Sequence, residues 1–203
     1  MYLKTLTTVT VAALAFATVC FAQGSVFSLD GGSQASSVNL VKGTTSFNFT
    51  NSAFLNALAP PAFPNGDICV NLYVYDPTPS EVLCCSCLVK TFQTINVAIS
   101  NEVARVPVFP HPIGVSAFAL ATSAGAATTC PSPSTVTQGQ VIPFGFVASK
   151  KVHSAFFQTN FEVLDTETLF TPFILGPQTT AQLTAACATA PITTCPSCTA
   201  GAQ

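Results

Sequence analysis

The two runs of sequence that decide the fold are CVNLYVY at residues 69–75 and EVLCCSCLVK at residues 81–90. The first run is dense in β-branched and aromatic residues, which is typical of a buried strand. Residues 76–80, DPTPS, separate the runs and contain two prolines, which cannot donate hydrogen bonds to a sheet. The sequence therefore predicts a β-hairpin in which the second run returns alongside the first.

This hairpin carries an unusual density of cysteine. Side chains alternate along a strand, so Cys85 and Cys87 share one face of the second strand and Cys84 points to the other. With the turn centred near residues 78–79, Cys69 lies beside Cys87 across the pair. A cross-strand disulfide between Cys69 and Cys87 is then geometrically reasonable.

The adjacent cysteines of the second run then need separate partners, such as Cys130 and the C-terminal tail. Cys187 lies close in sequence to Cys195 and Cys198, so one of these two is its expected partner. Eight cysteines allow about 105 pairings, and the sequence does not choose among them. The disulfide candidates are Cys69, Cys84, Cys85, Cys87, Cys130, Cys187, Cys195 and Cys198.

The first 22 residues predict a secretory signal peptide. Lys4 supplies the positive start, residues 9–21 form the apolar core, and small residues precede a cleavage point before Gln23. The core is shorter than the roughly 20 residues of a membrane-spanning helix, the alternative interpretation. No later stretch is apolar and long enough to span a bilayer, so the mature chain is not expected to be integral to the membrane.

Cleavage would leave residues 23–203 as a single secreted domain that is mainly β. The expected architecture is an antiparallel β-sandwich, stapled by disulfides, with one short C-terminal helix. Residues 23–37, rich in Gly and Ser, are expected to form a flexible arm or a first edge strand. Further strands are predicted at residues 45–50, 94–100, 114–122, 141–148 and 155–164, and the helix at residues 179–188.

Composition excludes some classes of function. Six Lys and Arg residues in a chain of 203 cannot form the basic surface that nucleic acid requires. Only 7% of the residues are charged and 49% are hydrophobic, the reverse of a disordered chain. The even count of eight cysteines after the leader is typical of an exported, disulfide-bonded protein.

Motifs for chemistry are scarce, and no catalytic, cofactor-binding or metal-binding residue is assigned. His111 lies between two prolines and His153 follows two lysines, and no acid stands in a recognisable motif with either. A secreted hydrolase that unites one of these histidines with an acid and a serine stays an alternative. A second is a metal-binding module of Cys84, Cys85, Cys87 and the tail thiols, although thiolates suit a reducing compartment.

The runs at residues 68–76 and 81–87 resemble a family of uncharacterised secreted bacterial proteins. That family has a C-x-N-x-Y-V-[FY]-D strand followed by an E-x-x-C-C-S-C strand. Later features occur in the family's order, at residues 147–158, 166–168, 183–187 and 195–198, although the family ends in a tighter C-x-C. The resemblance runs from Gly66 onward and implies export and a shared fold, with no activity attached.

The low charge suggests how such a domain could act. A β-rich chain with few charges has little to prevent pairing between exposed strand edges. The sequence thus predicts a secreted structural or adhesive protein, extracellular or at the cell surface, without catalytic activity. Its expected partner is a second copy or a cell-surface molecule.

Overall fold

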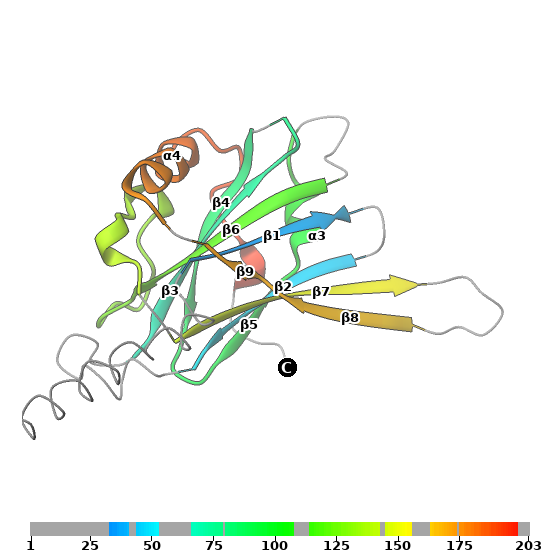
Figure 1. Ribbon diagram of the computed structural model, residues 1–203, viewed down its shortest axis with the longest axis horizontal. Coiled ribbons are helices and arrows are strands. Elements are labelled where there is room, and N and C mark those ends of the chain that lie inside the picture. The colour runs from blue at the N-terminus through cyan, green and yellow to red at the C-terminus, as the bar shows by residue number, and fades with distance from the viewer. Residues whose placement is uncertain are drawn as a thin grey trace, which may run out of the picture.

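A computed structural model describes residues 33–40, 44–52, 66–78, 80–107, 114–142, 145–155, 163–173 and 175–198. Two antiparallel sheets face each other, and a short C-terminal helix covers the outer side of one of them (Figure 1). This arrangement confirms the predicted mainly β sandwich with one short C-terminal helix. The predicted signal peptide lies outside the described residues.

Sheet A has five strands in the order β4-β3-β6-β1-β9. In that order they are β4 (Glu81–Val89), β3 (Ile68–Tyr75), β6 (Gly114–Ser123), β1 (Ser33–Asn39) and β9 (Thr171–Pro172). The predicted hairpin is confirmed, because β3 and β4 pair as antiparallel neighbours in this sheet. Sheet B has four strands in the order β5-β2-β7-β8. These are β5 (Thr94–Val97), β2 (Thr44–Asn51), β7 (Phe146–Ala155) and β8 (Val163–Leu169).

The helices are short. They are α3 (Ile99–Val103), α4 (Pro177–Cys187) and the 3₁₀ turns η3 (Pro133–Thr135), η4 (Gln138–Gln140) and η5 (Pro196–Cys198). Helix α4 confirms the predicted C-terminal helix, and Pro177 stands in its first turn, where a missing backbone N–H costs nothing. No helix within the described ranges is long and apolar enough to cross a membrane.

The main core lies between the sheets. Sheet B contributes Phe47 and Phe49 of β2 and Phe146 of β7, each fully buried. The rings of Phe47 and Phe170 pack edge to face, with centroids 5.0 Å apart. Sheet A contributes the alternate residues of β3 that include Val70.

Strand β3 is buried on both faces, which explains why its sequence is apolar without a period of two. On the other face Tyr73, with Tyr75 beside it, packs in a second cluster with Leu183 and Cys187 of α4. Sheet A therefore has an inner face toward sheet B and an outer face under α4 and η3.

Of the two structures expected for residues 23–37, the described part forms a strand and not a flexible arm, although that strand is not at the edge of the sheet. Residues 33–39 form β1, which pairs with β6 on one side and with β9 on the other. The strand reads SQASSVN and offers little apolar pattern. Gln34 ties it to sheet B, because its amide donates to the Phe146 carbonyl at 2.8 Å and its oxygen accepts from the Ala148 amide at 3.0 Å.

Three predicted strands have different limits in the structure. The strand expected at residues 94–100 ends at Val97, and α3 begins at Ile99, although Ile95, Val97 and Ile99 are all buried. The strands expected at residues 141–148 and 155–164 are replaced by β7 and β8, which begin and end at other residues. Residues 156–162 lie outside the described ranges.

Candidate functional site

The β3–β4 hairpin holds one partner of every disulfide among the described residues. The pairs are Cys69–Cys130, Cys84–Cys187, Cys85–Cys195 and Cys87–Cys198. Their Cα separations run from 5.2 to 5.8 Å, inside the usual range for disulfides. We call this unit the disulfide hairpin.

The pairing expected between Cys69 and Cys87 is wrong. In the β3–β4 register Cys69 lies opposite Leu88, and Cys87 lies opposite Val70. Directly opposed residues share a face, so an offset of one position sends the two cysteines to opposite faces of sheet A. Cys69 instead bonds Cys130, in the segment that follows β6.

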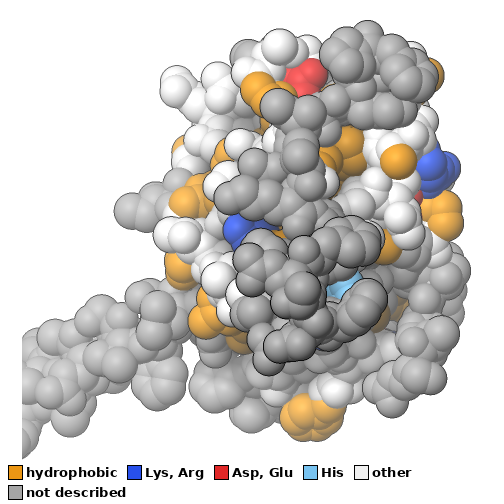
Figure 2. Space-filling model, turned by 90° about the vertical axis from the view of Figure 1, so that its right-hand side faces the viewer, with side chains coloured by type: hydrophobic (Ala, Val, Ile, Leu, Met, Phe, Trp, Pro, Cys, Tyr) orange, Lys and Arg blue, Asp and Glu red, His pale blue; other side chains and the backbone are white. Residues whose placement is uncertain are grey.

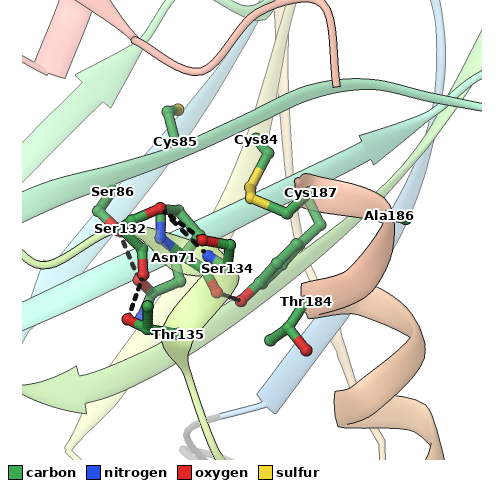
Figure 3. Close-up of a disulfide and its surroundings, with 12 residues drawn as sticks. Asn71, Cys84, Cys85, Ser86, Ser132, Ser134, Thr135, Thr184, Ala186 and Cys187 are labelled. Carbon is green, nitrogen blue, oxygen red and sulfur yellow. Dashed lines mark hydrogen bonds between the residues drawn. A yellow bond between two sulfur atoms is a disulfide. The ribbon is translucent and has the colours of Figure 1, made fainter. Parts of the chain in front are cut away.

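The pairing expected for Cys187 within the tail is also wrong, since Cys187 bonds Cys84 across the outer face of sheet A (Figure 3). The separate partners expected for Cys84 and Cys85 are confirmed. Cys85 bonds Cys195 on the inner side, where both belong to the main core. The disulfide hairpin therefore anchors chain segments on both faces of the sheet.

The C-terminal segment also covers the edge of sheet A. Ile192 forms a parallel bridge with Leu83, and the Cys84 amide donates to the Ile192 carbonyl at 2.8 Å. The Cys85–Cys195 and Cys87–Cys198 bonds hold the following residues there. β4, the edge strand of sheet A, therefore does not offer a free edge along this stretch.

A buried polar network lies on the outer face beneath the segment that holds η3 (Figure 3). The Asn71 amide donates to the Leu120 carbonyl at 3.1 Å and to the Thr122 hydroxyl at 3.2 Å. Its oxygen accepts from the Ser86 hydroxyl at 2.5 Å. The Tyr73 hydroxyl donates to the Pro133 carbonyl at 2.9 Å, which fixes η3 over the strand.

A cavity of about 650 Å³ lies between α4 and the outer face of sheet A. We call it the helix hollow. It is lined by Tyr75, Asp76, Pro77, Ser116, Phe118, Thr179, Gln182, Leu183 and Ala186. Its wall from α4 follows one helix face, with spacings of three and four residues, and its floor comes from β3 and β6. Nothing in the sequence singled out these residues, because the hollow depends on where α4 sits.

A buried carboxyl lies beside this cavity, at the β4 position opposite Tyr75. Glu81 is 9% exposed, and neither of its oxygens makes a hydrogen bond with the described residues. Burial raises the pKa of Glu81 to about 7, while the nearby Tyr75 hydroxyl acts in the opposite direction. A Glu81 oxygen and the sulfurs of Cys84 and Cys187 lie within 4.8 Å of one another. Burial and the Glu81 charge raise the pKa of Tyr75 as well.

A second cavity, of about 400 Å³, opens near the start of β2 on sheet B. His153 lines it, together with Lys151 and several hydroxyl and amide side chains. By backbone register His153 lies opposite Thr44 of β2 on one side and opposite Asp165 of β8 on the other. The structure thus brings one predicted histidine beside a hydroxyl and an acid position, on an exposed face. His111 lies outside the described residues.

The thiol groups of the metal alternative are tied up in disulfides. The sulfurs of Cys85, Cys195 and Cys198 lie within 4.8 Å of one another. In the reduced chain these could supply thiolate ligands, whereas a sulfur in a disulfide has no thiolate to offer. Metal binding by these cysteines therefore requires that their disulfides are first reduced.

Comparison with protein-family models, with curated proteins and with solved structures finds nothing that matches this chain.

Proposed function

We propose that this protein is exported and acts outside the cytoplasm as a structural or adhesive domain, without a catalytic step. The observation that carries the proposal is the disulfide hairpin, whose four cysteines bond the four other described cysteines. Disulfides persist in oxidising compartments, and the first 22 residues read as a leader for export.

The arrangement of the bonds suits a domain that must keep its shape outside the cell. One hairpin is linked covalently to the segment after β6, to the end of α4 and to the C-terminal tail. Each bond closes a loop of 61 residues or more in sequence, which limits how far the chain opens. Such cross-links favour persistence under mechanical load or protease attack.

Three of the four sheet edges, those at β4, β9 and β8, are poorly suited to pairing between copies, which favours attachment to a partner over self-assembly. The tail covers β4, and β9 has only two residues, one of them Pro172. At the edge strand β8, antiparallel pairing of two copies about Thr166 would set Asp165 of one against Glu167 of the other. Like charges placed directly opposite destabilise a pair of strands.

The surface agrees with an attachment role. On the face shown in Figure 2, described charged side chains are few, and hydrophobic ones form small separate patches. A surface of this kind contacts a partner without a strong electrostatic field. We therefore propose a cell-surface molecule as the partner.

Expression with the native leader tests this proposal. The cells should export the chain, the exported chain should show no free thiols in denaturant, and cells that export it should retain added oxidised chain in a saturable manner. A matched sample that is reduced and alkylated should lose retention. Cytoplasmic chain with reduced cysteines would refute export, and oxidised chain that no cell retains would refute the adhesive role.

A second candidate is a secreted hydrolase, favoured by the row that joins Thr44, His153 and the backbone position of Asp165. A hydroxyl nucleophile next to a histidine held by an acid is the arrangement of acyl-transfer enzymes. Turnover of simple activated esters, lost in His153→Ala and kept in a variant at an unrelated exposed position such as Gln178→Ala, would establish it. Turnover that survives His153→Ala would remove it.

A further inference from the structure

We infer that the helix hollow binds a neutral sugar ring, and that this is the contact by which the attachment domain recognises its partner. The second half of this inference rests on the proposed function, whereas the first concerns the cavity alone. Three features of the lining carry it: the size and aromatic floor, the unpaired neutral polar groups, and the absence of a cation.

The size and the floor of the hollow fit a small ring. Its volume of about 650 Å³ lies within the range of about 300–1,000 Å³ that holds small ligands. The rings of Tyr75 and Phe118 meet edge to face, with centroids 5.9 Å apart. Phe118 packs in the same manner on Phe173, at 5.6 Å. A supported aromatic surface of this kind matches the apolar C–H face of a sugar ring.

The walls offer neutral side-chain groups that form no hydrogen bond with the described residues. The hydroxyls of Thr180 and Thr184 in α4 donate to the carbonyls of Gly176 and Thr180 in their own helix. In contrast, the hydroxyl of the third threonine of the helix, Thr179, makes no hydrogen bond among the described residues, and this side chain lines the hollow.

Two further side chains share this property. Gln182, one helical turn after Thr179, and Ser116, across the cavity on β6, have no hydrogen-bond partner in the described part of the chain. The three groups offer both donors and acceptors. Ring hydroxyls, which both donate and accept, are the ligand groups that complement such a set.

The charges around the hollow disfavour an anionic ligand. Asp76 is the one charged residue that lines it, and no described Lys or Arg does so. The Asp76 Oδ1 atom already accepts from the Thr78 amide at 2.9 Å and from the Ser80 amide at 3.0 Å. An acidic sugar would meet this carboxylate and find no counter-charge.

The disulfide hairpin holds the cavity open in advance of binding. Cys187 ends α4 and is bonded to Cys84 on the sheet, so this end of the helix cannot swing away. Leu183, one turn earlier, is buried against the same face. A site fixed before its ligand arrives avoids the entropy loss of ordering a mobile helix.

Tyrosine fluorescence offers a direct readout. The chain has no Trp and three Tyr, of which Tyr2 lies in the predicted leader. In the exported chain, emission therefore comes from Tyr75, which lines the hollow, and from Tyr73, which is buried in the cluster with Leu183. We would titrate the oxidised chain with D-glucose, D-galactose, D-mannose and N-acetyl-D-glucosamine, and separately with D-glucuronate and n-butylamine.

The inference predicts a saturable change in emission with at least one of the four neutral sugars, and a weaker response to D-glucuronate. Gln182→Ala should weaken that binding by at least about fivefold, the effect of one lost hydrogen bond. Gln178→Ala, the same change at an exposed position of the same helix outside the hollow, should leave it unaltered. Both variants should keep the unfolding midpoint of the parent chain.

Several results would overturn the inference: no saturable response to any neutral sugar, equal binding by the two glutamine variants, or saturation by n-butylamine in place of sugars. If no sugar binds while cells still retain the oxidised chain, the sugar site is wrong and the attachment role stands. If sugar binds but Gln182→Ala leaves cell retention unchanged, the hollow is a sugar site and the recognition half of the inference is wrong.

Discussion

Cys84 and Cys85 are neighbours in β4, yet their disulfides run to opposite faces of sheet A. Cys84 holds the end of α4 on the outer face, and Cys85 holds the tail at Cys195 on the inner side. Alternation of side chains along a strand makes two adjacent cysteines the shortest device for anchoring both faces of one sheet. The core, the α4 layer and the helix hollow all depend on this strand.

The four disulfides should contribute unequally to stability. Cys69–Cys130 closes a loop of 61 residues, and no other disulfide restrains the same two chain segments. We therefore expect Cys69→Ala/Cys130→Ala to lower the free energy of unfolding by about 4 kcal/mol, the value for a loop of this length. Cys87–Cys198 closes only a small ring once Cys85–Cys195 holds the tail, and Cys87→Ala/Cys198→Ala should cost about 2 kcal/mol. Urea unfolding of the oxidised proteins measures both, and the reverse order would contradict this pairing.

The Asn71 network should be costly to disrupt. Asn71 is fully buried and its side chain bonds to β6 and to Ser86 of β4. Asn71→Ala leaves these buried partners unsatisfied, so the free energy of unfolding should fall by about 2–3 kcal/mol. Asn96→Ala removes an exposed bond to Asn48 and is the matched control, expected to cost about 0.5 kcal/mol or less. Equal losses in the two variants would show that the network is not buried.

Glu81 should make the fold less stable as the pH rises. Its pKa is about 7 in the folded chain against an ordinary value of 4.5, so the folded chain binds this proton more tightly. The contribution of Glu81 to the free energy of unfolding is therefore complete below about pH 4.5. It falls between about pH 4.5 and pH 7, and it changes no further above about pH 7.

The variant Glu81→Gln isolates this effect. It should lack the decline across the window and should exceed the parent chain at pH 8 by up to about 3 kcal/mol in the free energy of unfolding. The pKa of Glu167 is lowered, chiefly by the hydrogen bonds from Ser149 and Asn48. Its protonation therefore changes stability only below about pH 4.5, outside the range in which Glu81 titrates. A parent chain that gains stability from pH 5 to pH 7 relative to Glu81→Gln would contradict the burial of this carboxyl.

Gln34 should be needed to hold β1 in place. Its side chain is 2% exposed and bonds β7 of the opposite sheet. Gln34→Ala should lower the free energy of unfolding by about 2 kcal/mol, with faster amide exchange in β1 than in β3. Unchanged exchange in residues 33–39 would mean that the ladder to β6 suffices to hold the strand.

The sequence predicts the strands with strong apolar patterns and misses those held by other means. The β3–β4 hairpin and α4 follow from β-branched runs, a proline turn and Pro177. The sequence of β1 has no such pattern. This strand is held by backbone hydrogen bonds to β6 and by the side chain of Gln34, and neither leaves an apolar signature in the sequence. The prediction of the Cys69–Cys87 pair is wrong for a related reason. A shift of one residue in the strand register moves a side chain to the other face of the sheet, and the sequence alone does not fix the register to one residue.

The candidate site was beyond sequence reasoning for a physical reason as well. The helix hollow combines β3, β6 and α4, which are far apart in the chain. Its polar residues are ordinary surface types, and only their lack of internal partners distinguishes them. Such a lack becomes visible once α4 is placed on sheet A.

The most direct test of the account is to map the disulfides of the exported protein by partial reduction, stepwise alkylation and mass spectrometry. Stepwise labelling is needed because Cys84 and Cys85 fall in one peptide. The account predicts no free thiol and the pairs Cys69–Cys130, Cys84–Cys187, Cys85–Cys195 and Cys87–Cys198. Free thiols in the exported chain, or a bond between any two of the four hairpin cysteines, would contradict it.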